Sequence, residues 1–296
     1  MNGLRLAVLT DVSAGDHGLA AAIEREPRVV ARHVTLGSEL PPNVDGVVVD
    51  VPLAKRFHAL SSLSGRMDLP ILTETPFAPN LALGHTLAEQ LSGHRVASLN
   101  PLAHHVSTMR LLEQVAEAAD PLETFFAARR FRSLDRSDQH LAQIVGFANA
   151  LTRSFPIRLS ALRRSSPDVL IALLRYEGDV VGSLEIGGHL PNQGPRFSEL
   201  LIECFCHASA YQCRAENQTI TLEADSRTYL DWAETPAAAM LSTFIALIQD
   251  DRMPRRGVED DLRTLAICAE ISVAATERMV RRLADAVQSS AKGENC

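Results

Sequence analysis

Glycine and lysine are both scarce in this sequence. The chain has 16 glycines in 296 residues, below the usual share of roughly 7%, and its only lysines are Lys55 and Lys292. Five cysteines at irregular spacing do not form a disulfide framework. Residues 204–213 hold three cysteines and one histidine, but their spacing matches no common zinc site. No metal site is therefore expected.

Long apolar runs and an excess of positive charge are also missing. No run approaches the ~20 residues needed to span a bilayer, and residues 1–8 lack the basic and apolar regions of a signal peptide. A cytoplasmic protein without a membrane partner is expected. The net charge of -7 argues against nucleic acid as a partner. With 46% hydrophobic and 22% charged residues, the chain is an ordinary globular protein.

Short apolar runs alternate with helical stretches over the first hundred residues. Strands are expected at residues 4–9, 29–34, 45–51, 70–73 and 95–99, with helices at 18–24, 54–64 and 80–92. Between the second and third strands, residues 37–43 contain two prolines and replace a full crossover helix. This alternation predicts βαβ units around a small, doubly wound parallel sheet.

The pattern changes in the second part of the chain. Helices are expected at residues 106–119, 138–153, 236–249 and 258–286. Strands are expected at residues 124–131, 157–163, 169–176, 180–187, 199–206, 210–215 and 219–222. Their succession predicts an antiparallel meander. We therefore expect an α/β domain at residues 1–120 and an α+β domain with a mostly antiparallel open sheet at 121–296.

The antiparallel sheet also predicts an oligomeric state. Alternation in residues 169–176 and 199–206 gives an apolar face that the few remaining helices do not cover. Such faces commonly pair across a two-fold axis. A homodimer that forms through the C-terminal sheet is expected.

This order of elements resembles the glucose-fructose oxidoreductase/inositol dehydrogenase (Gfo/Idh/MocA) family. Residues 45–52, DGVVVDVP, are similar to the family segment "vDaVvvatP", and residues 74–76, ETP, lie where the family has "EKP". Residues 138–146 correspond to "D-x-G-x-H-x-x-D…G", and residues 258–279 resemble the family's last helix. The resemblance implies a Rossmann domain that binds NAD or NADP, followed by a substrate domain. It also implies dimers that associate through the second sheet.

The cofactor site departs from the family pattern, so a degenerate Rossmann domain is expected. Thr10, Val12 and Gly15 stand where the family has the three glycines of G-x-G-x-x-G, which make the turn, admit the pyrophosphate and pack the helix. Val12 adds crowding of ~1–3 kcal/mol, and Asp11 adds repulsion of order 1 kcal/mol. Together they weaken dinucleotide binding by about two to three powers of ten. Thr35 replaces the acidic residue expected beside the adenosine ribose.

The resemblance also assigns the remaining cofactor and catalytic positions. Asp50, Pro52, Glu74 and Thr75 fall at the other positions of the cofactor site. The family's acid/base group is the lysine of "EKP", an aspartate and a histidine, which here are Thr75, Arg136 and His140. Threonine lacks the charge and reach of lysine. His140 can still serve as a general acid or base near pH 7 without hydride chemistry.

Substrate-binding residues are expected after the fifth strand and in the arginine-rich segment 129–136. The candidates are Asn100, His104, His105, Arg132 and Arg136. Adjacent arginines can hold a carboxylate or phosphate in bidentate fashion, although a solvated strand end explains the cluster equally well.

Three functions follow from these observations. The first is a lyase, isomerase or cyclase that has lost its nicotinamide cofactor and acts on a small-molecule, specialised metabolite in the cleft between the domains. The second is an NAD- or NADP-dependent oxidoreductase of a sugar-like or specialised metabolite, with an atypical phosphate loop. The third is a non-catalytic partner of a related enzyme. The missing glycines and lysine favour the first.

Overall fold

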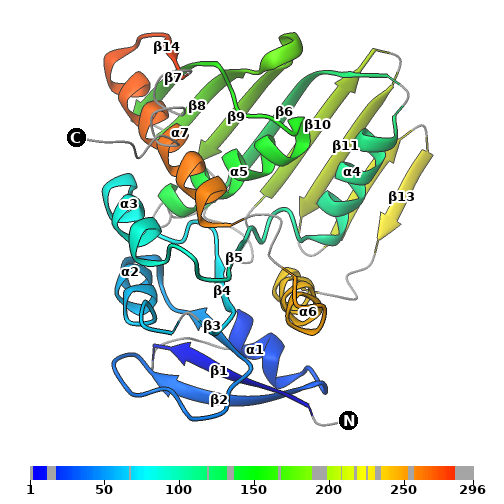
Figure 1. Ribbon diagram of the computed structural model, residues 1–296. Coiled ribbons are helices and arrows are strands. Elements are labelled where there is room, and N and C mark those ends of the chain that lie inside the picture. Colours follow the sequence, from blue (N-terminus) through cyan, green and yellow to red (C-terminus); the bar gives the residue numbers. More distant parts are fainter. Residues whose placement is uncertain are drawn as a thin grey trace. The chain divides into compact units, whose positions relative to one another are not determined.

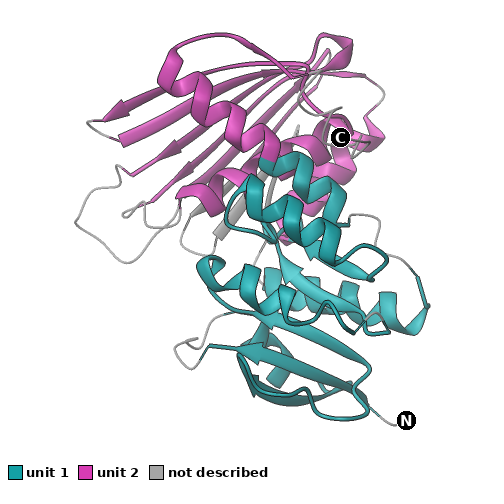
Figure 2. Cartoon of the chain, turned by 60° about the vertical axis from the view of Figure 1, so that its left-hand side comes forward, with its two compact units in different colours: residues 1–104, 234–265 teal, residues 105–233, 266–296 magenta. Residues whose placement is uncertain are grey.

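The chain forms two compact units, which Figure 2 shows in different colours. Unit 1 comprises Met1–His104 and Glu234–Leu265, and unit 2 comprises His105–Ala233 and Ala266–Cys296. The computed structural model describes residues 3–11, 18–66, 68–118, 120–131, 137–165, 168–188, 199–207, 209–216, 219–224, 226–230, 235–252 and 257–283. None of the helices in these ranges is both long enough and apolar enough to cross a membrane.

Unit 1 contains the parallel sheet that the sequence predicts. Its strands are β1 (Leu4–Thr10), β2 (Val29–Thr35), β3 (Gly46–Asp50), β4 (Ile71–Glu74) and β5 (Val96–Leu99). They lie in the order β2-β1-β3-β4-β5, and every pair is parallel. The helices of this unit are α1 (Leu19–Glu24), α2 (Leu53–Ser61), α3 (Leu81–Gln90) and α6 (Pro236–Gln249). The Rossmann-like prediction is confirmed (Figure 1).

Both faces of this sheet are buried, because successive side chains of a strand point to opposite faces. Leu6 and Val8 pack in one core with residues of α1 and α6. Ala7 and Leu9 pack in the other core with residues of α2 and α3. The central strand β3 therefore shows a continuous apolar run, whereas the edge strand β2 contains the exposed residues Arg32 and His33.

Unit 2 contains a nine-stranded mixed sheet. Its strands are β6 (Leu122–Arg130), β7 (Arg158–Ser165), β8 (Asp168–Arg175), β9 (Val181–Gly187), β10 (Glu199–Cys206), β11 (Ala210–Glu216), β12 (Thr219–Ala224), β13 (Ser226–Leu230) and β14 (Arg281–Arg282). The order is β13-β12-β11-β10-β6-β9-β8-β7-β14. A 3-10 turn, η1 (Glu177–Asp179), joins β8 and β9. The mostly antiparallel open sheet is confirmed.

The prediction of a simple meander is wrong in one respect. β6 lies between β9 and β10, pairs with β9 in parallel, and pairs with β10 in antiparallel fashion. Two strands that follow each other in sequence, β9 and β10, are therefore not neighbours. Local sequence patterns identify the strands, but the pairing of a strand with a distant segment depends on tertiary packing. β13 was also not expected.

Helices cover one face of this second sheet. α4 (Val106–Glu117) contacts β11 and β12, and α5 (Ser137–Thr152) contacts β6 and β9 (Figure 1). α7 (Val258–Glu277) begins in unit 1 and continues in unit 2. The sequence predicts this helix to residue 286, but it ends at Glu277, because Arg278 adopts a left-handed φ of 56°. β14 follows and pairs with β7.

The division into units differs from the expected boundary at residue 120. Residues 105–120 belong to unit 2, since α4 packs on strands of that unit. Residues 234–265 return to unit 1, because α6 places Met240, Leu241, Phe244 and Ile245 in one of its cores. A single boundary in sequence cannot describe a chain that returns to its first unit.

Candidate functional site

The carboxyl edge of the parallel sheet brings several expected residues together. Thr10, the last residue of β1, is in register with Thr35 of β2 on one side and with Asp50 of β3 on the other. The strand order changes direction between β1 and β3. Open α/β sheets bind their ligands outside such a switch point. This edge is therefore the candidate ligand site of unit 1.

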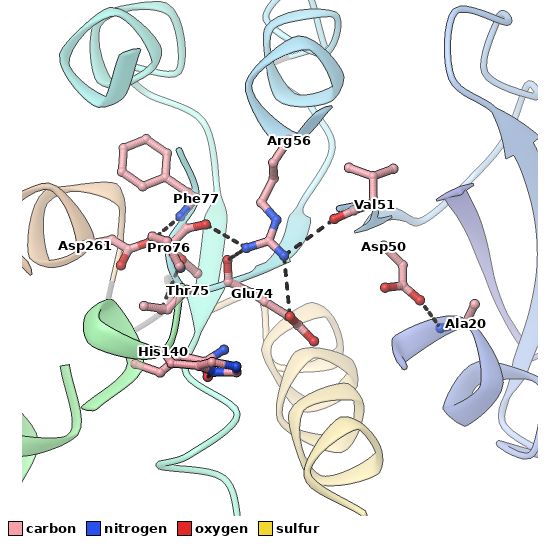
Figure 3. Close-up of polar contacts among 12 residues, drawn as sticks. Ala20, Asp50, Val51, Arg56, Glu74, Thr75, Pro76, Phe77, His140 and Asp261 are labelled. Carbon is pink, nitrogen blue, oxygen red and sulfur yellow. Dashed lines mark hydrogen bonds and ion pairs between the residues drawn. The ribbon is translucent and has the colours of Figure 1, made fainter. Parts of the chain in front are cut away.

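Asp50 holds the beginning of α1. Its Oδ2 accepts a hydrogen bond of 2.7 Å from the backbone N–H of Ala20 (Figure 3). Gly18, which precedes the helix, has a φ of 149°, and a Cβ added there would lie 3.0 Å from Asp50 Oδ2. The glycine therefore permits the close approach of a carboxylate to the backbone. The carboxylate of Asp50, a side chain of the protein itself, thus lies at the N-terminal end of α1.

A second carboxylate lies at the same edge. Asp11 follows β1, and its Oδ2 is 2.5 Å from Nζ of Lys55 in the first turn of α2. Pro52, expected at the cofactor site, is the N-cap residue of this helix. One of the two lysines in the chain is thus paired with the acidic residue that follows β1.

A buried arginine holds the segment after β4. Arg56 Nη1 donates to the backbone oxygens of Glu74 and Pro76 at 2.8 and 2.6 Å, and its Nη2 lies 3.4 Å from Glu74 Oε2. Arg56 is 3% exposed. Burial lowers the pKa of Arg56, and the carboxylate of Glu74 opposes this shift. The guanidinium fixes the backbone on both sides of Thr75, whose peptide bond to Pro76 is cis.

A buried acid holds the next residue of the same segment, Phe77. Asp261, in the first turn of α7, accepts hydrogen bonds from the backbone N–H of Phe77 at 2.7 Å and from Ser98 Oγ at 2.6 Å (Figure 3). Burial raises the pKa of Asp261 to about 6, while these hydrogen bonds and Arg56 act in the opposite direction. Two buried side chains, Arg56 and Asp261, therefore hold the backbone around Thr75.

Thr75, Asn100 and His104 have local structural contacts. Thr75 is buried, and its N–H donates to the Leu99 oxygen at 2.9 Å. Asn100 Oδ1 accepts from the Leu102 N–H at 3.0 Å, and the Asn100 backbone oxygen lies 2.9 Å from His104 Nδ1. Asn100 and His104 therefore stabilise the turn after β5.

His140 lies in a cluster of side chains in unit 2. Its ring stacks on Phe131 with 3.8 Å between ring centroids and 13° between planes. Its Nδ1 is 3.5 Å from Gln143 Oε1, which accepts a 2.6 Å hydrogen bond from Arg129 Nη1. The Arg129 guanidinium also lies over the Phe131 ring at 5.1 Å. A predicted acid/base residue is therefore oriented by an aromatic ring and by an amide that an arginine fixes.

His105 faces the same arginine but has a different environment. It is buried, and its Nδ1 lies 2.8 Å from Ser107 Oγ. Burial lowers the pKa of His105 to about 4, and the positive charge of Arg129 acts in the same direction. His105 is therefore neutral at pH 7 and provides no charge for an anionic substrate.

Four expected site residues cannot be placed. Val12, Gly15, Arg132 and Arg136 lie outside the described residues. Within the described part of the chain, no group of three or more His, Cys, Asp or Glu side chains could hold a metal ion.

Arg56, Phe131 and Asp261 are among the residues of these networks that were not expected. The sequence contains a signal for Arg56 and Asp261. Asp261 occupies the apolar stripe of α7 that Leu262 and Leu265 continue, and Arg56 occupies the stripe of α2 with Leu60. A charge on an apolar stripe indicates a buried, partnered group. Phe131 carries no comparable signal, since its partner is on a separate helix.

Solved structures resemble this chain over almost its full length, although no protein-family model and no curated protein matches the sequence. A protein assigned as an NADPH-dependent oxidoreductase from Desulfitobacterium hafniense has a TM-score of 0.81 at 12% identity, covering 97% of this chain and 99% of that one. Aldose-aldose oxidoreductase from Caulobacter crescentus has a TM-score of 0.75 at 14% identity, covering 95% and 100%.

A third structure is an oxidoreductase from Agrobacterium radiobacter in complex with NAD+, L-tartaric acid and magnesium. It has a TM-score of 0.74 at 11% identity and covers 95% of this chain and 98% of that one. The chain therefore has the fold of the Gfo/Idh/MocA-type oxidoreductases and dehydrogenases.

Proposed function

We propose that this chain is a nicotinamide-dependent oxidoreductase of a small, sugar-like hydroxylated metabolite, with His140 as its proton-transferring side chain. The observation that carries the proposal is the placement of His140 in this fold, stacked on Phe131 and in contact with Gln143. The similar structures support the redox class, since they include an NADPH-dependent oxidoreductase and an oxidoreductase in complex with NAD+. They lend no support to the expectation of a lyase, isomerase or cyclase without a cofactor.

The carboxyl edge of β1 and β3 has features that suit a dinucleotide. The Ala20 amide and the space at Gly18 already accommodate an anionic oxygen. The Thr35 hydroxyl stands at the end of β2, where dinucleotide folds place the group that contacts the adenosine ribose. When bound, a nicotinamide dinucleotide supplies hydride transfer. The edge differs from that of a typical site because Asp50 is in contact with this amide.

His140 would exchange a proton with the substrate hydroxyl or carbonyl oxygen. The oxygen of Gln143 facing Nδ1 favours the tautomer with hydrogen on Nδ1, which leaves Nε2 as the basic nitrogen. Stacking on Phe131 restricts rotation of the imidazole. Arg129 fixes Gln143 and so orients His140 indirectly, as a positioning residue.

Substitution of His140 tests this function. Turnover is followed by nicotinamide fluorescence with NAD+ or NADP+ and a panel of aldoses, polyols and hydroxy acids. His140→Gln should lower kcat roughly 10²–10⁴-fold, the usual contribution of general acid/base catalysis. His207→Gln is the matched control, because His207 is exposed in the same unit. Equal turnover in His140→Gln and the wild type would remove His140 from the mechanism.

Proton transfer without a dinucleotide is a second candidate function. Two observations favour it: Asp50 contacts the Ala20 amide, and Thr75 stands at the lysine position. This function predicts that candidate substrates exchange carbon-bound hydrogen for deuterium in D2O without any nucleotide. Nuclear magnetic resonance detects that exchange. The oxidoreductase function predicts no exchange when nucleotide is absent.

A further inference from the structure

Asp50 places negative charge at the switch point of the parallel sheet. It is in register with Thr10, and Asp11 follows in sequence, so two carboxylates end two adjacent strands. The charge of Asp11 is balanced by Lys55 at 2.5 Å. Asp50 instead makes its hydrogen bond to a backbone amide, which is a neutral donor.

The positive charge of Arg56 is directed mainly to groups other than Asp50. Arg56 interacts electrostatically with Asp50, but its guanidinium donates to the backbone oxygens of Glu74, Pro76 and Val51 and to the carboxylate of Glu74. Figure 3 shows these contacts of Arg56 and, separately, the hydrogen bond between Asp50 and Ala20. Among the residues that the structure describes, the Asp50 carboxylate thus has a hydrogen bond from a neutral amide and the more distant charge of Arg56.

The backbone around Asp50 is shaped to accept this carboxylate. Gly18 has a φ of 149°, and a Cβ at this position would lie 3.0 and 3.3 Å from the two oxygens of Asp50. The 2.7 Å bond from Ala20 then fixes one of these oxygens. In dinucleotide folds, a glycine and the following amides bring the backbone close to a diphosphate. Here they bring it close to an aspartate.

We propose that Asp50 is an internal anion that competes with the diphosphate of a nicotinamide dinucleotide, so that the wild-type chain binds the cofactor weakly. The inference rests on the proposed function, because it assumes that the dinucleotide approaches this edge. A bound diphosphate must either displace the carboxylate from the Ala20 amide or lie beside a like charge. Displacement and repulsion each raise the dissociation constant of the dinucleotide. The repulsion raises it less at high salt, because ions screen the two charges.

The experiment measures the dissociation constants of NADH and NADPH by nucleotide fluorescence for the wild type and three variants. Asp50→Asn keeps the shape and an oxygen that can accept from Ala20, but removes the charge. Asp50→Ala removes both the charge and the oxygen that accepts from Ala20. Asp45→Asn is the matched control, because Asp45 precedes the same strand and caps the Arg5 amide at the opposite edge. Thermal unfolding with and without nucleotide provides a second readout and verifies that each variant is folded.

Asp50→Asn should bind at least one dinucleotide roughly 10- to 100-fold more tightly than the wild type, the range expected for removal of one nearby like charge. The ratio should shrink as salt is raised, and Asp45→Asn should bind like the wild type. Tight binding by the wild type that Asp50→Asn does not improve overturns the inference but leaves the proposed function standing. If none of the four folded proteins binds NADH or NADPH, both the inference about Asp50 and the proposed function are overturned.

Discussion

Asp261 is an acid buried in a helix turn, and its surroundings explain how it is tolerated. Two donors, the Phe77 amide and the Ser98 hydroxyl, point to one of its oxygens, and Arg56 contributes positive charge. Burial nevertheless raises its pKa from 3.8 to about 6. The held segment includes Thr75, so this acid connects stability with the geometry of the candidate site.

The raised pKa predicts the pH dependence of stability. The folded state binds this proton more tightly than the unfolded state, so the stabilisation is complete below pH 3.8 and is lost as pH rises through about 6. Between about pH 4 and pH 7, the free energy of unfolding of the wild type should fall by about 2 kcal/mol relative to Asp261→Asn. Urea unfolding at a series of pH values measures this difference.

Asp260→Asn provides the control, since Asp260 is the partly exposed neighbour that pairs with Arg263 at 3.9 Å. Asp260→Asn should keep the fall in stability between pH 4 and pH 7 that Asp261→Asn removes, because Asp261 is still present. If the curves of wild type and Asp261→Asn run parallel, Asp261 does not titrate in the folded protein as its burial indicates.

At the residue scale, a motif can fix the position of a candidate residue. The segments 138–146 and 45–52 single out His140 and Asp50, and each has defined partners in the structure, but their functional roles stay predictions. The contact of Asp50 with Ala20 could not be deduced, because it joins residues thirty positions apart on two different elements. The stacking of Phe131 on His140 depends on the packing of β6 and α5, which no local pattern encodes.

At the scale of elements, the outer face of the second sheet carries several exposed apolar side chains. Leu162, Leu173, Val181 and Phe205 are 45%, 49%, 39% and 46% exposed. The strand registers place all four on the same face, through pairs such as Arg175 with Val181 and Thr124 with Phe205. The alternate residues Leu174 and Leu184 are buried on the other face. We propose that two chains associate through this outer face.

Light scattering after size-exclusion chromatography tests that association. The wild type should be a dimer, because an exposed apolar face of this kind is removed from water on pairing. Leu173→Glu should shift the protein to the monomer. Val30→Glu is the control, since Val30 is 52% exposed on the other sheet, and it should remain dimeric. A monomeric wild type contradicts the proposal.

Element identity was largely predictable, but element pairing was not. Buried parallel strands such as β3 are continuous apolar runs, which the sequence shows directly. The insertion of β6 between β9 and β10 joins segments more than fifty residues apart, as in the pair Phe125–Gly182. A Cβ at Gly182 would lie 2.2 Å from the Phe125 ring, so the glycine makes room for this ring. The need for that space becomes evident only once the pairing is known.

At the scale of the whole molecule, the two units provide different parts of the proposed chemistry. Unit 1 has the strand order and carboxyl edge of a dinucleotide fold, with Asp50 held at its switch point. Unit 2 has His140 with its orienting partners. The central claim is that this chain transfers hydride to a small carbonyl substrate and that His140 supplies the proton.

Isotope transfer tests this claim most directly. The Asp50→Asn variant is incubated with NADPH or NADH deuterated at the transferable position of the nicotinamide ring and with a panel of ketoses, aldoses and keto acids. Mass spectrometry then measures deuterium in the alcohol products. A deuterated product is expected, and its amount should fall strongly when His140→Gln is added to the same variant. Bound dinucleotide without deuterium transfer to any substrate of the panel would contradict it.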